Sequence, residues 1–405
     1  MRHALALLAL LLAAALPAPA QDADAIARTR NAIQEALKQR PDDATLHFFL
    51  ARADALGGDA RACTEELEKT AKLGDGFLPA KQLGFEKVWG DPAFQAERAR
   101  MESKLPRLDY APTAVELEDR GLLPEGLAYD APSESFFLGS IAKRKVVRVS
   151  KEGAVTDFTV EGAGMDSVLG IAVDSPRRIL YAVSTSALTI EGRKTRRNAI
   201  FAYDVDSGRL LRRMEIVGAV GLNDVAVAPG GRVFTTDSGS GAVYEVFADK
   251  APKAWVEAGG LPGANGLAAS ADASRLYVAH NTGIGVVDLA KGAITRRIAN
   301  STRENVSAID GLYQWHGQLV GVQNVTTPGR VILITLSSDG GTITTVKTLL
   351  SHHHNALDEP TTGAATDRGF FLLAATGTAH YDDQGKIDDP DGVPKPTVVR
   401  VLLPR

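Results

Sequence analysis

The sequence predicts a mainly β protein, in which a six-bladed β-propeller follows a small all-α segment. Two observations predict the propeller: a short tripeptide recurs six times, roughly every 40 to 55 residues, and the clearest units each contain four short runs rich in β-branched and aromatic residues. A third observation predicts the helical segment, because apolar residues at the start of the mature chain recur at helical spacing.

The recurring tripeptide begins each unit. Its six copies are Glu125-Gly126-Leu127, Leu169-Gly170-Ile171, Asn223-Asp224-Val225, Asn265-Gly266-Leu267, Asp310-Gly311-Leu312 and Thr362-Gly363-Ala364. In the third unit, strands are expected at residues 223–228, 232–236, 242–247 and 253–257. Four antiparallel strands repeated six times is the pattern of a six-bladed propeller. A β-sandwich array and a β-helix are the alternatives, and both are disfavoured by four strands per period.

The first twenty residues are expected to be a secretory signal peptide. An unbroken apolar run at residues 4–16 follows a short polar head, and Ala18-Pro19-Ala20 fits a cleavage site. The mature protein is therefore expected in the periplasm or secreted. No later segment approaches 18 consecutive apolar residues, so no membrane span is expected. The predicted organisation is residues 1–20 signal peptide, 21–104 helical segment, 105–117 linker and 118–405 propeller.

Pro41 ends the first predicted helix, Asp43 can cap the second, and a Gly-Gly-Asp turn at residues 57–59 precedes a third. Two antiparallel helices in about 34 residues resemble a tetratricopeptide unit. The sequence leaves two interpretations open for this segment: a small packing domain, or a groove that binds a protein partner.

Composition excludes some functions. The net charge of -4 and the pI near 6.1 give no indication of a nucleic-acid partner. Cys63 is the only cysteine, so an exported form would have no internal disulfide. Stability must then come from packing or from a bound ion.

Closing the units into a ring would bring the leading residues of the tripeptides to one point on the axis. Four of those residues offer oxygen ligands, namely Glu125, Asn223, Asn265 and Asp310. Two carboxylates and two amide carbonyls suit a hard divalent cation. Ca²⁺ is the first expectation, with Mg²⁺, Mn²⁺ or Zn²⁺ as alternatives. Each residue alone could instead be a turn former, but Leu169 and Thr362 indicate that the turn needs no ligand-type residue.

Loops between the second and third strands of each blade should lie on the same face as these ligands. Strand counting places the following predicted substrate-binding residues on that rim: Ser140, Asp237, His280, Asn281, Gln323 and Asn324. The run His352–His354 lies between the fifth and sixth units. Three consecutive residues cannot all face one ion from a strand, so a solvated loop is favoured over a second metal site.

Three phrases carry a family resemblance: residues 123–130 (LPEGLAYD), 223–232 (NDVAVAPGGR) and 310–313 (DGLY). With their order and spacing, residues 118 to 405 resemble the senescence-marker-protein, gluconolactonase and luciferin-regenerating-enzyme family. The resemblance implies a six-bladed propeller with a divalent cation in its central channel. Sugar-lactone members of the family carry an Arg two residues before the first Asn. This sequence has Gly221 at that position, so the resemblance does not extend to the sugar-binding members.

The resemblance also implies roles. Glu125, Asn265 and Asp310 would bind the metal, Asn223 would lie on the metal or substrate side, and Asp310 would be the general base. The implied activity is hydrolysis of a lactone or ester of a small molecule. The alternative is a non-catalytic scaffold, in which the cation is structural and the propeller or the helical segment binds a partner.

Overall fold

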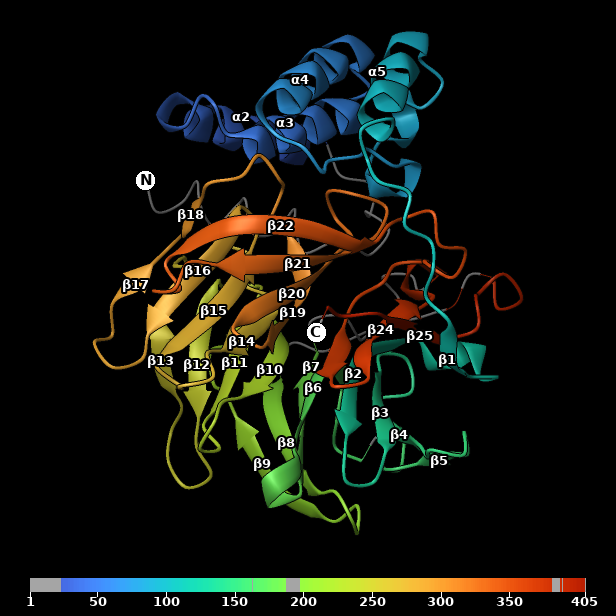
Figure 1. The fold of residues 1–405 in the computed structure, drawn as a ribbon, viewed down its shortest axis with the longest axis vertical. Helices are drawn as coiled ribbons and strands as arrows, with labels where there is room; N and C mark the ends of the chain where they lie inside the picture. The colour runs from blue at the N-terminus through green and yellow to red at the C-terminus, as the bar shows by residue number, and fades with distance from the viewer. Residues whose placement is uncertain (1–22, 162, 187–196, 381–386, 388, 405) are drawn as a thin grey trace.

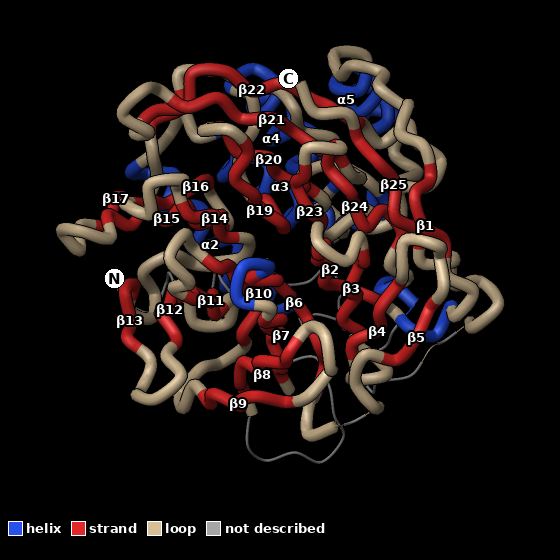
Figure 2. Tube along the Cα trace, turned by 60° about the horizontal axis from the view of Figure 1, so that its bottom comes forward, coloured by secondary structure: helices blue, strands red, loops and turns tan. Residues whose placement is uncertain are grey.

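The computed structural model describes residues 23–161, 163–186, 197–380, 387 and 389–404, and shows a six-bladed β-propeller with a helical segment at one end (Figure 1). Six sheets surround one axis, with strands β2, β6, β10, β14, β19 and β23 innermost (Figure 2). The predicted signal peptide lies outside the described residues. Within them, no helix combines the length and apolar character needed to cross a membrane.

The six blades are antiparallel sheets, apart from one short parallel pairing in blade five. Blade one contains β2 (Pro124–Asp130), β3 (Ser135–Ser140), β4 (Val146–Val149) and β5 (Val155–Asp157). Blade two contains β6 (Ser167–Asp174), β7 (Ile179–Thr185), β8 (Asn198–Asp204) and β9 (Leu210–Glu215). Blade three contains β10 (Leu222–Val227), β11 (Val233–Asp237), β12 (Ala242–Val246) and β13 (Lys253–Val256). These last four lie within one or two residues of the strands that the third unit predicts.

The remaining blades follow the same plan. Blade four contains β14 (Leu267–Ala269), β15 (Arg275–His280), β16 (Gly283–Asp288) and β17 (Ile294–Thr295). Blade five contains β19 (Ile309–Trp315), β20 (Gln318–Gln323), β21 (Arg330–Leu336), β22 (Thr342–Leu350) and the short β18 (Ala299–Asn300). Blade six contains β23 (Gly363–Thr366), β24 (Gly369–Ala375), β25 (Thr397–Val401) and β1 (Thr113–Glu116).

Strand β1 closes the ring, because this early strand pairs antiparallel with β25 near the end of the chain. Residues 105–117, which the sequence predicts to be a linker, therefore contain the outermost strand of blade six. That strand is short and mostly exposed on its side chains, which is why its sequence carries little strand signal.

The hydrophobic core is divided into clusters between neighbouring blades. One cluster joins blades one and two through Phe137, Phe201 and Tyr203, and another joins blades six and one through Phe371 and Phe136. Every blade thus buries both of its faces, so the propeller needs no disulfide to hold its ring together.

The helical segment comprises α2 (Ala23–Gln39), α3 (Ala44–Gly57), α4 (Ala60–Leu73) and α5 (Pro92–Glu102). Asp43 caps α3 by accepting hydrogen bonds from the backbone N–H groups of Thr45 and Leu46, as the sequence predicts. The core of this segment contains Phe48, Phe85 and Phe94, and it also packs against Ala308 and Val325 of the propeller. The helices therefore share a core with blade five.

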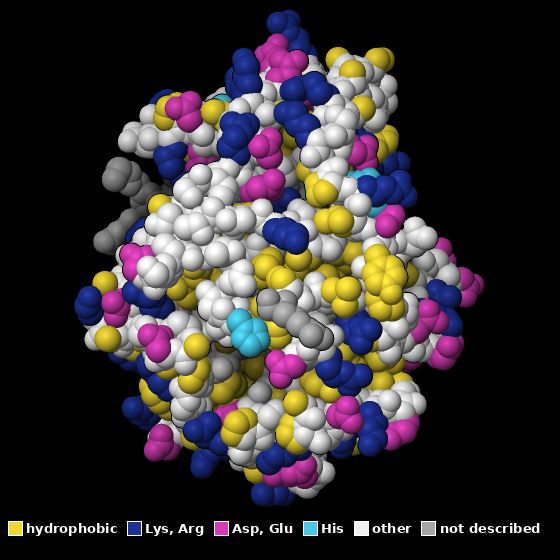
Figure 3. Space-filling view, in the orientation of Figure 1, with side chains coloured by type: hydrophobic (Ala, Val, Ile, Leu, Met, Phe, Trp, Pro, Cys, Tyr) yellow, Lys and Arg dark blue, Asp and Glu magenta, His cyan; other side chains and the backbone are white. Residues whose placement is uncertain are grey.

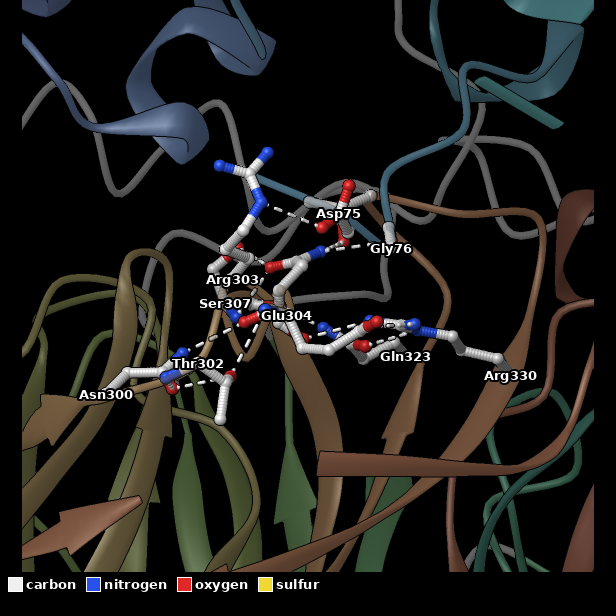
Figure 4. Close-up of polar contacts among 11 residues, drawn as sticks. Asp75, Gly76, Asn300, Thr302, Arg303, Glu304, Ser307, Gln323 and Arg330 are labelled. Carbon is white, nitrogen blue, oxygen red and sulfur yellow. Dashed lines mark hydrogen bonds and ion pairs between the residues drawn. The ribbon is translucent and has the colours of Figure 1, made fainter. Parts of the chain in front are cut away.

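A strap at residues 74–78 fixes the helical segment to the propeller (Figure 4). The Asp75 N–H donates to the Arg303 carbonyl at 2.8 Å, and the Asn305 N–H donates to the Asp75 carbonyl at 2.9 Å. The guanidinium of Arg330 is buried beneath Gly76 and donates to Gln323 Oε1 and to the Asn305 carbonyl. These contacts lie at the adjoining ends of β20 and β21 and just before β19, so the helices cover part of the face where the inner strands begin.

Acidic and basic side chains are interspersed over the face shown in Figure 3. That face has no broad area of a single charge sign, the electrostatic feature that nucleic-acid-binding proteins carry.

Candidate functional site

The six tripeptides lie at the beginnings of the innermost strands, where neighbouring blades approach closely. The second tripeptide position is Gly in five blades, and in blades one, two and four a Cβ there would collide with the next blade. A Cβ on Gly126 would lie 2.1 Å from the Leu169 carbonyl oxygen, and one on Gly266 would lie 2.2 Å from the Asp310 carbonyl oxygen. Glycine at this position therefore allows the strands to converge, which brings side chains from different blades together around the axis.

Three buried carboxylates interact there: Glu125 of β2, Asp224 of β10 and Asp310 of β19. Burial raises the pKa of Glu125 well above its usual value, and the charges of Asp310 and Asp224 raise it further. Burial also raises the pKa of Asp310 to about 6 and the pKa of Asp224 to about 7. Acidic groups this close without a cation between them hold protons near neutral pH.

Amide side chains complete the cluster around Asp310. Asn324 Nδ2 donates to Asp310 Oδ2 at 2.6 Å, and the Asn265 side chain also hydrogen-bonds to this carboxylate. Both hydrogen bonds favour the ionised form of Asp310. Asn324, which the sequence places on the substrate rim, thus belongs to the carboxylate cluster.

Two buried oxygens in this cluster have no hydrogen-bond donor: Oε2 of Glu125 and Oδ1 of Asn324. An unpaired buried oxygen is costly, and a cation would satisfy both. The donor set consists of carboxylate and amide oxygens, which are the ligands of Ca²⁺ and Mg²⁺ rather than of softer metals. The residues present therefore fit a hard divalent cation.

In blade three, the residue that joins the carboxylate cluster is Asp224, the second residue of the tripeptide. The charge of Asp224 raises the pKa of Glu125, while Asn223 is half-buried at the start of the same strand. The Asp224 side chain has room because the residue facing it is Gly170. A Cβ on Gly170 would lie 2.2 Å from Asp224 Oδ1. The sequence carried a signal for Asp224, since it is the one exception among six residues at the Gly position.

Tyr313 and Glu359 also adjoin the cluster, and the sequence analysis missed both. The charges of Asp224, Glu125 and Asp310 contribute to raising the pKa of Tyr313, after burial, and its hydroxyl accepts a hydrogen bond from the Gly363 N–H at 2.8 Å. Burial raises the pKa of Glu359 to about 7. Its carboxylate accepts hydrogen bonds of 2.6 Å from the Thr378 hydroxyl and from the Ala379 N–H. Tyr313 is recognisable in sequence because the equivalent residue in the other blades is Ala, whereas Glu359 lies outside the repeat.

The other predicted rim residues are buried and have hydrogen-bond partners within the protein. Ser140 Oγ donates to the Leu122 carbonyl and accepts from the Lys143 N–H. Asp237 accepts from the N–H groups of Val220 and Gly221, both at 2.8 Å. These contacts give the two side chains a structural role in turning the loops.

His280 hydrogen-bonds through Nε2 to the Arg296 carbonyl at 2.8 Å, and burial lowers its pKa to about 4. Asn281 is buried against Gly263, where a Cβ would lie 1.9 Å from its Oδ1. Gln323 donates to the Ser307 carbonyl at 2.7 Å and accepts from Arg330. The structure thus gathers Glu125, Asp310, Asn265 and Asn324, and uses the remaining rim residues mainly to hold loops and the junction.

No protein-family model matches the chain, and no curated protein matches it. Solved structures do. A gluconolactonase from Xanthomonas campestris is 19% identical, with 74% of this chain and 95% of that chain covered and a TM-score of 0.48. A luciferin-regenerating enzyme is 17% identical, with coverages of 72% and 96% and a TM-score of 0.49. A putative oxidoreductase (glucose dehydrogenase) from Thermus thermophilus is 15% identical, with coverages of 72% and 99% and a TM-score of 0.50. At these identities the likeness concerns the propeller fold alone.

Proposed function

We propose that the axial cluster binds a divalent cation, with Ca²⁺ the first choice, and that the protein hydrolyses a lactone or ester of a small molecule. The observation that carries the proposal is the buried, uncompensated pair of Glu125 and Asp310, beside unpaired oxygens on Glu125 and Asn324. Glu125, Asp310, Asn265 and Asn324 would hold the ion, with Asn223 on the metal or substrate side.

A bound divalent cation would polarise the substrate carbonyl and lower the pKa of water. Asp310 is the proposed proton acceptor. Burial raises its pKa to about 6 in the ion-free protein, and a bound cation would lower that pKa, so the carboxylate would be ionised near neutral pH, as a proton acceptor must be. Hydrogen bonds from Asn324 and Asn265 hold that carboxylate in place. Glu359, whose carboxylate is fixed by Thr378 and Ala379, would add a second acidic group at the edge of the site.

A binding role without turnover is the competing proposal, and the docked helical segment favours it. Ala308 and Val325 belong to the core of that segment, and they lie two and one residues from Asp310 and Asn324. The helices thus restrict one side of the site and offer an additional surface for a protein partner. In either case, the apolar run at residues 4–16 supports export to the periplasm or secretion.

A hydrolysis panel separates the two proposals. The purified protein is treated with chelator and assayed on lactones and aryl esters, alone and after addition of Ca²⁺, Mg²⁺, Mn²⁺ or Zn²⁺, and Tm is recorded in the same wells. Turnover restored by one ion supports the hydrolase. An ion-dependent rise in Tm with no turnover on any substrate supports the scaffold, and the absence of both contradicts the cation proposal.

A further inference from the structure

A second cluster of metal-ligating side chains lies at the junction between the helices and the propeller. Glu102 ends helix α5, and His352 and His353 follow strand β22. One potential ligand atom from each lies within 4.8 Å of the other two, and among the described residues no other three His, Cys, Asp or Glu side chains meet this criterion. His352 Nε2 is 3.1 Å from Glu102 Oε1. The sequence alone favours a solvated loop for these histidines, because it cannot show that Glu102 reaches them.

The hydrogen bonds of His353 leave one ring nitrogen available for a metal. Ser351 Oγ lies 3.1 Å from the Leu108 carbonyl, which can only accept, and 2.9 Å from His353 Nδ1. A hydroxyl that donates its one proton to that carbonyl accepts from His353 Nδ1. A neutral His353 that donates through Nδ1 carries its lone pair on Nε2. In metal-binding histidines, the ring nitrogen that does not bind the metal typically donates a hydrogen bond to another group, which fixes the tautomer.

His354 differs and provides a matched control. Its Nε2 donates to the Ala111 carbonyl at 2.8 Å, and its Nδ1 accepts from the Ala356 N–H at 3.2 Å. Both ring nitrogens are therefore occupied within the protein, although His354 is adjacent in sequence and similarly half-buried.

The net charge of the cluster favours binding of an ion with moderate affinity. Arg98 Nη1 binds Glu102 Oε2 at 2.8 Å, which leaves Oε1 facing His352. Arg98 offsets the carboxylate charge, so the ion would be held mainly by nitrogen coordination. Glu102 and His352 are both partly buried, with 33% and 12% of their side chains exposed, so an ion has access from solvent.

We propose that Glu102, His352 and His353 bind Zn²⁺, with water as the fourth ligand, and that the ion joins helix α5 to the propeller. Two imidazole nitrogens and one carboxylate oxygen form a ligand set typical of zinc. Ligands at about 2.1 Å from a tetrahedral ion are roughly 3.4 Å apart, so the 3.1 Å between His352 and Glu102 needs only a small adjustment. Because the ion binds groups 250 residues apart, it stabilises the docked helices.

The test is Zn²⁺ binding to the purified full-length protein without a polyhistidine tag, measured by competition with a chromophoric chelator. Saturating Ca²⁺ is present to occupy the axial cluster. The wild type should bind one Zn²⁺, and His352→Ala and His353→Ala should each weaken binding by about 100-fold or more, beyond the roughly 10–100-fold loss that outer partners of a metal site give. His354→Ala and the axial variant Glu125→Gln should retain wild-type affinity.

Co²⁺ gives an independent readout, because a tetrahedral Co²⁺ site absorbs strongly in the visible range. That band should be present in the wild type and in His354→Ala, and absent in His353→Ala. Absence of Zn²⁺ binding by the wild type, or undiminished binding by both His352→Ala and His353→Ala, would overturn the proposal. The result is independent of whether the axial cluster is catalytic, since neither readout measures turnover.

Discussion

The axial cluster and the junction cluster are assembled in opposite ways. At the axis, equivalent positions of different blades supply oxygen donors, and among the described residues no cationic side chain contributes to the pKa shifts of Glu125 and Asp310. At the junction, unrelated segments supply two imidazoles and a carboxylate that Arg98 already neutralises.

This difference in charge predicts a difference in dependence on metal. Uncompensated buried carboxylates destabilise the ion-free protein, so an axial cation should strongly affect both stability and activity. The junction is electrically balanced without an ion, so zinc should add only modest stability there.

The largest effect is expected from Asp310→Asn. The amide retains the shape of the carboxylate and removes the negative charge beside Glu125. The ion-free variant should therefore melt at or above the wild-type Tm. Ca²⁺ affinity should fall by about 100-fold or more, since a charged ligand is lost, and turnover should disappear. Calorimetric titration and the hydrolysis panel measure these changes. Asp249→Asn, a change at an exposed residue, is the control and should alter neither; equal Ca²⁺ affinity in both variants would refute the axial site.

Gly76→Ala is expected to destabilise the junction by about 2–3 kcal/mol. Gly76 has a φ of +81°, and a Cβ there would lie 2.4 Å from Arg330 Nη2. Tm and urea unfolding measure the loss, and Gly57→Ala is the matched control because a Cβ at Gly57 would meet nothing within 4 Å.

The same variant tests whether the two clusters are independent. Zn²⁺ affinity should fall in Gly76→Ala, because Glu102 belongs to the displaced helical segment. Ca²⁺ affinity should stay within about threefold, an effect below 1 kcal/mol, because the axial donors belong to the propeller. A comparable loss of both affinities would show that docking of the helices also positions Asn324.

The repeat pattern predicts the propeller, the inner strands and the presence of Glu125 and Asp310 at one point, because these follow from the period of the sequence. It does not predict which partners a loop side chain finds, such as the Leu122 carbonyl for Ser140 or the Val220 N–H for Asp237. Nor can a local pattern bring Glu102 to His352 or β1 to β25. Those contacts depend on how distant segments pack, which one sequence does not encode in any short motif.

The pH dependence of stability should distinguish the axial cluster from the junction cluster. Burial raises the pKa of Asp310 to about 6 and that of Asp224 to about 7, from 3.8 for an unperturbed aspartate. Between about pH 4 and pH 7 these two carboxyl groups bind more protons in the ion-free folded protein than in the unfolded chain, so their contribution to stability falls as pH rises. A cation competes with those protons and binds the ionised groups.

The Tm gain produced by Ca²⁺ should accordingly be larger at pH 8 than at pH 5, by roughly 2–4 °C or more. Thermal melts with and without Ca²⁺ across this range measure it. In Asp310→Asn the dependence should be much flatter, and a gain that is constant or larger at pH 5 would contradict the proposed ligands.

The smallest effect is expected from Tyr313→Phe, which tests how the axial site is closed from the opposite face. Inner strands of all six blades line a cavity of about 480 Å³ there, and Tyr313 and Asp224 are among the lining residues. Tyr313 occupies the tripeptide-following position where the other blades have Ala128, Ala172, Ala226, Ala268 and Ala365. We expect its ring to separate this cavity from Glu125 and Asp310, the two carboxylates of the cluster that do not line it.

Losing only the hydroxyl leaves the Gly363 N–H without its acceptor, so Tyr313→Phe should lower stability by about 1 kcal/mol and leave Ca²⁺ release unchanged. Tyr313→Ala removes the ring as well and joins the cavity to the site. Release of Ca²⁺ to excess chelator, followed by stopped-flow fluorescence, should then become faster in the alanine variant alone. Equal release rates in the two variants would mean that the ring does not separate the two ends of the channel, and that the ion is protected by its ligands from the mouth.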